Sequence, residues 1–170
     1  MAHILPKDEE LFKRIAREHI QVDPALWNAI YQNVGDVIIV INLLVRSYID
    51  DNQEIPKTEA GKILEYTKRL ISVIKKIDHP EAIAADEKDQ FFRAIRDRGL
   101  RLDPVTHELF GNYVRNDINI INLVCINCVD PLDTRETMTI ADARKILDHT
   151  RSTMRFLDRL REATSKSETF

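Results

Sequence analysis

The chain has 170 residues, of which 44% are apolar and 31% charged, and its formal net charge is -3. This composition excludes a chain that is disordered throughout, because such chains are poor in Leu, Ile, Val and Phe. The slight negative charge provides no overall positive field for holding duplex DNA. Four Gly and six Pro are too few for the many turns of a sandwich or barrel, so we expect an all-α protein.

We expect a cytosolic protein that does not enter a membrane. Residues 1–8 contain neither a cationic leader nor an apolar stretch, which argues against a signal peptide. The longest apolar run, residues 37–45, is interrupted by Asn42 and is much shorter than the ~20 residues of a membrane span. Only two cysteines occur, Cys125 and Cys128, and we expect both to be reduced.

The chain contains an internal repeat. Residues 10–50 align without a gap with residues 90–130, at an offset of 80. After a three-residue insertion the match continues at an offset of 83, where residues 60–64 face residues 143–147. We therefore predict a helical bundle of two duplicated three-helix units with pseudo-twofold symmetry, within a single globular domain over residues 1–170.

Repeat 1, about residues 7–77, is predicted to form three helices. The first spans about residues 7–19. The second begins at Asp23-Pro24, where the aspartate can cap the free amides and the proline suits the first turn, and it runs to about Tyr48. The third begins near Pro56 and carries apolar residues at a seven-residue spacing.

Repeat 2, about residues 90–163, follows a polar connector at residues 78–89. Its helices are predicted over about 86–98, 104–128 and 139–160. Asp103-Pro104 opens the second of them, and Thr139 with Asp142 forms an approximate capping box at the third. We expect the polar tail, residues 164–170, to fray.

The central helix of each repeat is apolar around nearly its whole circumference, which predicts burial on nearly all sides. We therefore expect the two central helices to pack against each other along a seam that brings Leu43 near Leu123, with the third helices outside. Homodimerisation through the same surface is the alternative. Asn42 and Asn122 occupy equivalent positions beside this seam. We interpret them as buried amides that fix the register, and the alternative is a polar ligand site at the pseudo-twofold axis.

The CxxC pair of Cys125 and Cys128 is predicted to belong to the core. Both thiols lie on the apolar stripe of the helix over 104–128, and neither a preceding strand nor a second CxxC accompanies them, as redox and zinc sites would require. The five histidines show no His-Glu-x-x-His or Glu-x-x-His pair. We therefore expect no metal and no other cofactor.

Asparagines accumulate on one face of the same predicted helix. Asn112, Asn116, Asn119 and Asn127 lie close together around the helix axis, with Arg115 beside them. Asparagine is a poor helix former, so its accumulation calls for a reason. We interpret this face as an interaction surface with the other repeat or another subunit, and the alternative is recognition of a polar ligand or RNA.

Part of the last third of the chain resembles HEPN domains, which are all-helical dimers that often act as ribonucleases. The run from Tyr113 to Ile120, which includes Arg115 and Asn116, followed by the capped helix over 139–160, is similar to their Arg-Asn-x-x-x-His stretch and final helix. Ile120 stands where the family has its histidine, so the resemblance implies an inactive, RNA-binding or scaffolding relative. Arg144 and His149 match the looser Arg-x4-6-His spacing and would be the catalytic pair of an enzymatic alternative.

These observations predict a non-enzymatic cytosolic binding or regulatory module that acts through protein–protein contacts. Its partner would be another protein or a second copy of the chain. The two alternatives are a HEPN-like RNA-binding or ribonuclease domain and a small-ligand sensor with a pocket at the pseudo-twofold axis.

Overall fold

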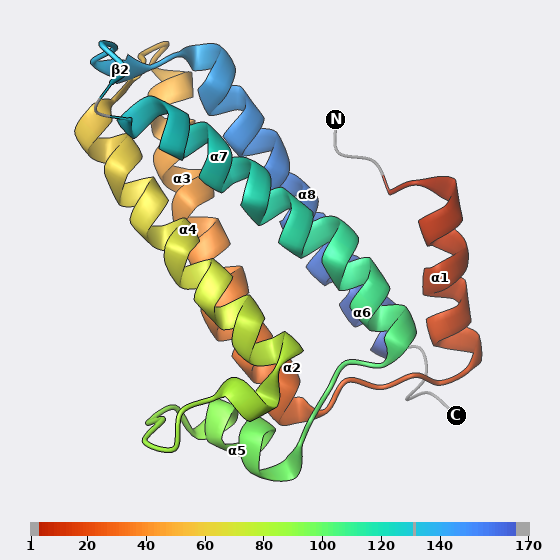
Figure 1. Ribbon diagram of the computed structural model, residues 1–170. Helices are drawn as coiled ribbons and strands as arrows, with labels where there is room; N and C mark the ends of the chain where they lie inside the picture. Colours follow the sequence, from red (N-terminus) through yellow and green to blue (C-terminus); the bar gives the residue numbers. More distant parts are fainter. Residues whose placement is uncertain (1–3, 131, 166–170) are drawn as a thin grey trace.

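The computed structural model describes residues 4–130 and 132–165, and helices form nearly all of the regular structure in them, which confirms the all-α prediction. Four long helices lie side by side in a bundle (Figure 1): α3 (Asp36–Asp50), α4 (Lys57–Asp78), α7 (Asn116–Val129) and α8 (Ile140–Ser165). The shorter helices are α1 (Pro6–Arg17), α2 (Pro24–Ile30), α5 (Gln90–Arg98) and α6 (Pro104–Phe110).

The two predicted central helices are continuous, but each contains a π-helical segment. Tyr31–Gly35 joins α2 to α3, and Gly111–Arg115 joins α6 to α7. The residues that flank both segments keep right-handed helical backbone angles, so the chain does not change direction there. Widened turns of this kind leave no signal in a hydrophobic pattern, so the sequence does not predict either segment.

The helix starts follow their caps. Asp23 and Asp103 each accept a 2.9 Å hydrogen bond from the backbone amide two residues further on, which caps α2 and α6 as predicted. Asp89 caps α5 in the same way, so this helix begins at Gln90 instead of near residue 86. Near the C-terminus the chain stays helical to Ser165, the last residue of α8. Residues 166–170 of the expected tail lie outside the described residues.

The long helices pair differently from the prediction. α3 packs mainly on α8, and α7 packs mainly on α4, while contacts of α7 with α8 and of α3 with α4 close the bundle. α3 and α7 therefore occupy diagonal corners, and their outer faces point away from each other. Leu43 is 57% exposed and Leu123 is 58% exposed. The predicted seam between the two central helices is wrong, because each of them is covered by α4 and α8 and its remaining side faces solvent.

The bundle is closed at its two ends by short elements (Figure 1). At one end β1 (Ile55–Pro56) pairs antiparallel with β2 (Thr137–Met138), and Ile55 faces Met138, with both side chains fully buried. At the other end α5 packs on α2. Two-residue strands are too short to produce an alternating pattern, so the sequence did not indicate them.

Aromatic side chains fasten α1 to the side of the bundle. The ring of Phe156 on α8 lies 6.0 Å from that of Phe12 on α1 and 6.4 Å from that of Phe110 on α6, measured between centroids. Tyr113 stacks on the same Phe156 ring at 5.6 Å. Such pairs add about 0.5–1.5 kcal/mol each beyond the burial of their area.

One helical stretch, Pro24–Asp50, is long and apolar enough to cross a membrane by length and composition. Of the most apolar 18-residue window in this stretch, 44% is buried inside the protein. The stretch contains α2 and α3, which pack on α5 and α8, and core helices have the same composition.

Asn42 and Asn122 each join the two helices of one main pair. Asn42 Nδ2 on α3 donates a 2.9 Å hydrogen bond to Thr150 Oγ1 on α8. Thr67 Oγ1 on α4 donates a 3.2 Å hydrogen bond to Asn122 Oδ1 on α7. Asn42 is buried, whereas Asn122 is half-buried. An amide that is satisfied only in one alignment favours that alignment over a slipped one, so both contacts fit the interpretation that these amides fix the register.

We predict that Thr150→Val lowers the free energy of unfolding by about 1–3 kcal/mol, because the amide of Asn42 would lose its partner at a position that is only 5% exposed. The double variant Asn42→Leu/Thr150→Val removes both polar groups and should recover most of that loss. Urea denaturation of the two variants and the wild type measures the difference. Equal losses in the single and the double variant would contradict the pairing.

Candidate interaction surface

The exposed side of α7 carries no charged side chain, although the structure describes this helix in full and it is about four turns long. The one charged residue of the helix, Asp117, is buried. Protein interfaces are depleted of charge at their centre, which is more apolar than the rest of the protein surface. We call the exposed set the α7 stripe, and its members are Asn116, Asn119, Ile120, Leu123, Ile126 and Asn127.

The structure brings together part of the surface predicted from the asparagines. Asn116 and Asn119 lie exposed on the α7 stripe. Asn112 and Arg115 precede it in the π-helical segment and are half-buried. The apolar circumference of the helix predicts burial on nearly all sides, and the structure instead exposes the aliphatic members of the stripe, Ile120, Leu123 and Ile126.

Arg115 is engaged inside the protein. Its Nη2 lies 2.5 Å from Asp78 Oδ2 at the end of α4, and His107 Nε2 lies 3.2 Å from the other carboxylate oxygen of Asp78. The side chain of Asp78 is only 13% exposed, so solvent screens these contacts weakly. The guanidinium of Arg115 therefore ties α4 to the start of α7 and has its charge already compensated.

The equivalent face of α3 has a different character. Leu43 is as exposed there as Leu123 is on α7, and Ile39 and Val40 lie beside it. Charged residues interrupt this face, however. Within the stretch equivalent to the α7 stripe they are Asp36 and Arg46, both exposed, while Asp50 is matched by the exposed Asp130 that follows α7. The α3 face therefore keeps the hydrated charges that the α7 stripe lacks.

A polar network lies beneath the α7 stripe and holds α7 on α8. Asp117 Oδ1 lies 2.8 Å from His149 Nδ1, and Asp117 Oδ2 accepts a 3.2 Å hydrogen bond from Thr153 Oγ1. The Nδ1 atom of His149 is thus engaged by the buried carboxylate of Asp117. Arg144 is exposed five residues earlier on α8, which corresponds to about 140° around a helix, so it lies on a different face from His149.

Tyr113 and Asp8 form a second buried polar contact, at the N-terminal end of the stripe. The Tyr113 hydroxyl donates a 2.5 Å hydrogen bond to Asp8 Oδ2 and accepts a 3.0 Å hydrogen bond from the backbone N–H of Leu5. Asp8 is 1% exposed, and its Oδ1 has no hydrogen-bond partner among the described residues. Burial, followed by the hydrogen bond to Asp8, raises the pKa of Tyr113 to about 12.

Cys125 and Cys128 lie on the inner side of α7, and both are free and buried. Burial raises the pKa of both thiols, that of Cys125 to about 12. Reactive CxxC pairs have a lowered thiol pKa instead, so the geometry favours the core-packing interpretation. Among the residues that the structure describes, no group of three or more His, Cys, Asp or Glu could hold a metal ion.

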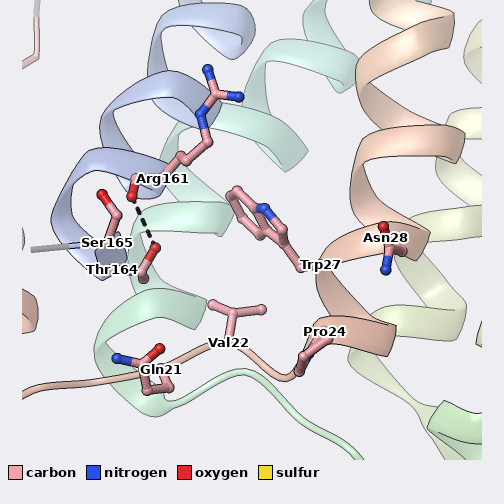
Figure 2. A pocket seen from close by; sticks show the side chains of 8 residues that line it. All are labelled: Gln21, Val22, Pro24, Trp27, Asn28, Arg161, Thr164 and Ser165. Carbon is pink, nitrogen blue, oxygen red and sulfur yellow. Dashed lines mark hydrogen bonds between the residues drawn. The ribbon is translucent and has the colours of Figure 1, made fainter. Parts of the chain in front are cut away.

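A cleft of about 250 Å³ opens between the start of α2 and the end of α8 (Figure 2). The indole of Trp27 projects into it from α2 and faces the α8 turn that carries Arg161. This volume is slightly below the roughly 300–1,000 Å³ of most small-molecule sites. Asn42 and Asn122, the predicted polar pair at the pseudo-twofold axis, are not among its lining residues.

No protein-family model, no curated protein and no solved structure matches the chain.

The contact between Tyr113 and Asp8 predicts a loss of stability at high pH. The pKa of Tyr113 is about 12 in the folded state, above its ordinary value of 10.0, so the folded protein binds the phenolic proton more tightly than the unfolded chain does. This contribution to stability is complete below pH 10 and is lost as the pH rises to about 12.

Tyr113→Phe should make the fall between pH 10 and pH 12 shallower. It should also lower the free energy of unfolding at neutral pH by about 1–3 kcal/mol, because the buried carboxylate of Asp8 would lose its donor. Urea denaturation at a series of pH values checks both effects. Parallel pH profiles for the variant and the wild type would show that Tyr113 does not cause the fall.

Proposed function

We propose that this chain is a non-enzymatic binding module that acts through protein–protein contacts made by the α7 stripe. The observation that carries the proposal is an exposed helix face without charge in a chain that is otherwise 31% charged. Each asparagine in a helix costs up to about 0.7 kcal/mol relative to alanine, so the stripe weakens an isolated α7. A protein that covered the stripe would bury its aliphatic side chains and satisfy its amides.

We also propose that the two halves of the chain arose by duplication and are related by pseudo-twofold symmetry. The π-helical segments Tyr31–Gly35 and Gly111–Arg115 support this, since they are separated by the same 80 residues as the sequence repeat. The antiparallel pairing of β1 with β2 also supports it. Each central helix packs on the third helix of the other half. The two Asn–Thr hydrogen bonds likewise join an asparagine of one half to a threonine of the other.

Duplication gives the difference between α3 and α7 a functional meaning. The outer faces of the two helices would have had a common origin, and Leu43 and Leu123 occupy the same place on them. Only the α7 face is free of charge, so the binding role is assigned to the second half of the chain. We propose a cytosolic location, in keeping with two free cysteines.

The other candidate functions have weaker support. The chain carries a net charge of -3, and the guanidinium of Arg115, the arginine of the predicted asparagine surface, is already paired with Asp78, so this side chain offers RNA phosphates little attraction. A ligand at the pseudo-twofold axis would have to compete with the threonines that already bond Asn42 and Asn122.

Photo-cross-linking tests the proposed function. A benzophenone amino acid in place of Asn127, on the α7 stripe, should give discrete protein adducts on irradiation in cells. The same amino acid in place of Ser47, the equivalent position on α3, which is also exposed, should give only background cross-linking. Mass spectrometry of the adducts identifies the partner. The absence of adducts from position 127, or equal adducts from both positions, would contradict the proposal.

A further inference from the structure

We propose that the protein that covers the α7 stripe is a second copy of this chain, docked antiparallel about a twofold axis that passes beside Leu123. The inference rests on the function proposed above and names the partner of the same surface. Twofold dimers bring the same patch of each subunit together, so the patch must complement itself.

The α7 stripe has the same order of side chains in both directions from Leu123. Ile120 and Ile126 lie three residues before and after it, and Asn119 and Asn127 lie four residues before and after it. All five residues are exposed. In an antiparallel pair of helices centred on Leu123, residues at equal separations before and after this position meet across the axis.

This arrangement joins groups that complement each other. Leu123 would contact the partner's Leu123, and Ile120 would contact the partner's Ile126. Asn119 would meet the partner's Asn127, and two amides can bond to each other because each has both donors and an acceptor. Asn116 would meet the exposed Asp130 of the partner, where an amide donor faces a carboxylate.

The corresponding face of α3 fails the same requirement. Centred on Leu43, an antiparallel pair would set Val40 against Arg46, which would desolvate a cation on an apolar side chain. It would also set Asp36 against the partner's Asp50, a repulsion between like charges. Self-complementarity therefore distinguishes the α7 stripe from a face of the same shape and exposure.

The inner side of α7 keeps the stripe rigid before docking. Ile118, Ile121 and Cys125 are fully buried in the bundle, and Asp117 is held by His149 and by Thr153. A preorganised surface loses little conformational entropy on association. One pair of helices provides less than the roughly 1,000 Å² of most stable interfaces, so we expect a dimer that dissociates on dilution.

Sedimentation velocity of the purified full chain tests this assignment. With increasing concentration the mass should rise from 19.8 kDa toward twice that value. Leu123→Asp should raise the dissociation constant at least about ten-fold, because two carboxylates would meet at the axis. Leu43→Asp, at an equally exposed position on α3, should leave the dissociation constant unchanged. Circular dichroism should show the same helix content in both variants, since neither side chain belongs to the core.

A pair of double variants tests the antiparallel arrangement. Asn119→Lys/Asn127→Glu would place a lysine opposite the partner's glutamate, and the dimer should remain within about three-fold of the wild type. Asn119→Lys/Asn127→Lys would place lysine opposite lysine and should weaken the dimer at least about ten-fold. Equal weakening by both double variants would overturn the antiparallel arrangement, because a parallel pair repels in both cases.

The outcomes separate this inference from the proposed function. A purified chain that remains monomeric at every concentration, or an equal effect of Leu43→Asp and Leu123→Asp, overturns the assignment of a second copy. If such a chain is still cross-linked in cells from position 127 to a different protein, the proposed function stands and only its partner changes. A monomer without any adducts from position 127 contradicts both.

Discussion

The pairing of α3 with α8 and of α7 with α4 is the constraint on which the rest of the molecule depends. Each pair is tied by an amide–hydroxyl hydrogen bond, from Asn42 to Thr150 and between Asn122 and Thr67. Because α4 and α8 together cover the inner sides of both central helices, α3 and α7 occupy diagonal corners. Their outer faces are therefore left to solvent or to another molecule, and the composition of each face decides which.

Local features of the sequence predicted the helices well, because their causes are local. Asp23 and Asp103 cap helices from the positions expected of them, each followed by a proline in the first turn. The position of each helix in the bundle could not be predicted in the same way. Hydrophobic periodicity indicates which side of a helix is apolar and is silent about what covers that side. Leu43 and Leu123 fit a buried seam and an exposed stripe equally well.

The candidate site was only half visible in the sequence for the same reason. Its asparagines were noticed, because asparagine is unfavourable within a helix and several of them share a face. Its aliphatic residues, Ile120, Leu123 and Ile126, look like core residues until the bundle is known. Arg115 looks like part of the surface until Asp78, distant in sequence, is found beside its guanidinium.

Two residues of the second half make buried polar contacts that their counterparts in the first half do not make. Asp117 and Tyr113 stand where the first half has Val37 and Asn33, so neither the contact with His149 nor that with Asp8 has a counterpart at the equivalent positions. The contact of Asp117 fixes α7 against α8, and the contact of Tyr113 fixes the π-helical segment before α7 against α1. The helix that carries the uncharged stripe and the segment before it thus have additional buried polar contacts, which preorganise the stripe for binding.

Thiol labelling of Leu123→Cys and Leu43→Cys at low and high protein concentration tests the central claim most directly. The native thiols are buried and have a raised pKa, so they contribute little to the signal. We expect fast labelling of both variants in dilute protein. At high concentration we expect slower labelling of Leu123→Cys only. Slow labelling of both variants in dilute protein would restore the seam between α3 and α7. Equal, fast labelling at every concentration would show that no second copy covers the α7 stripe.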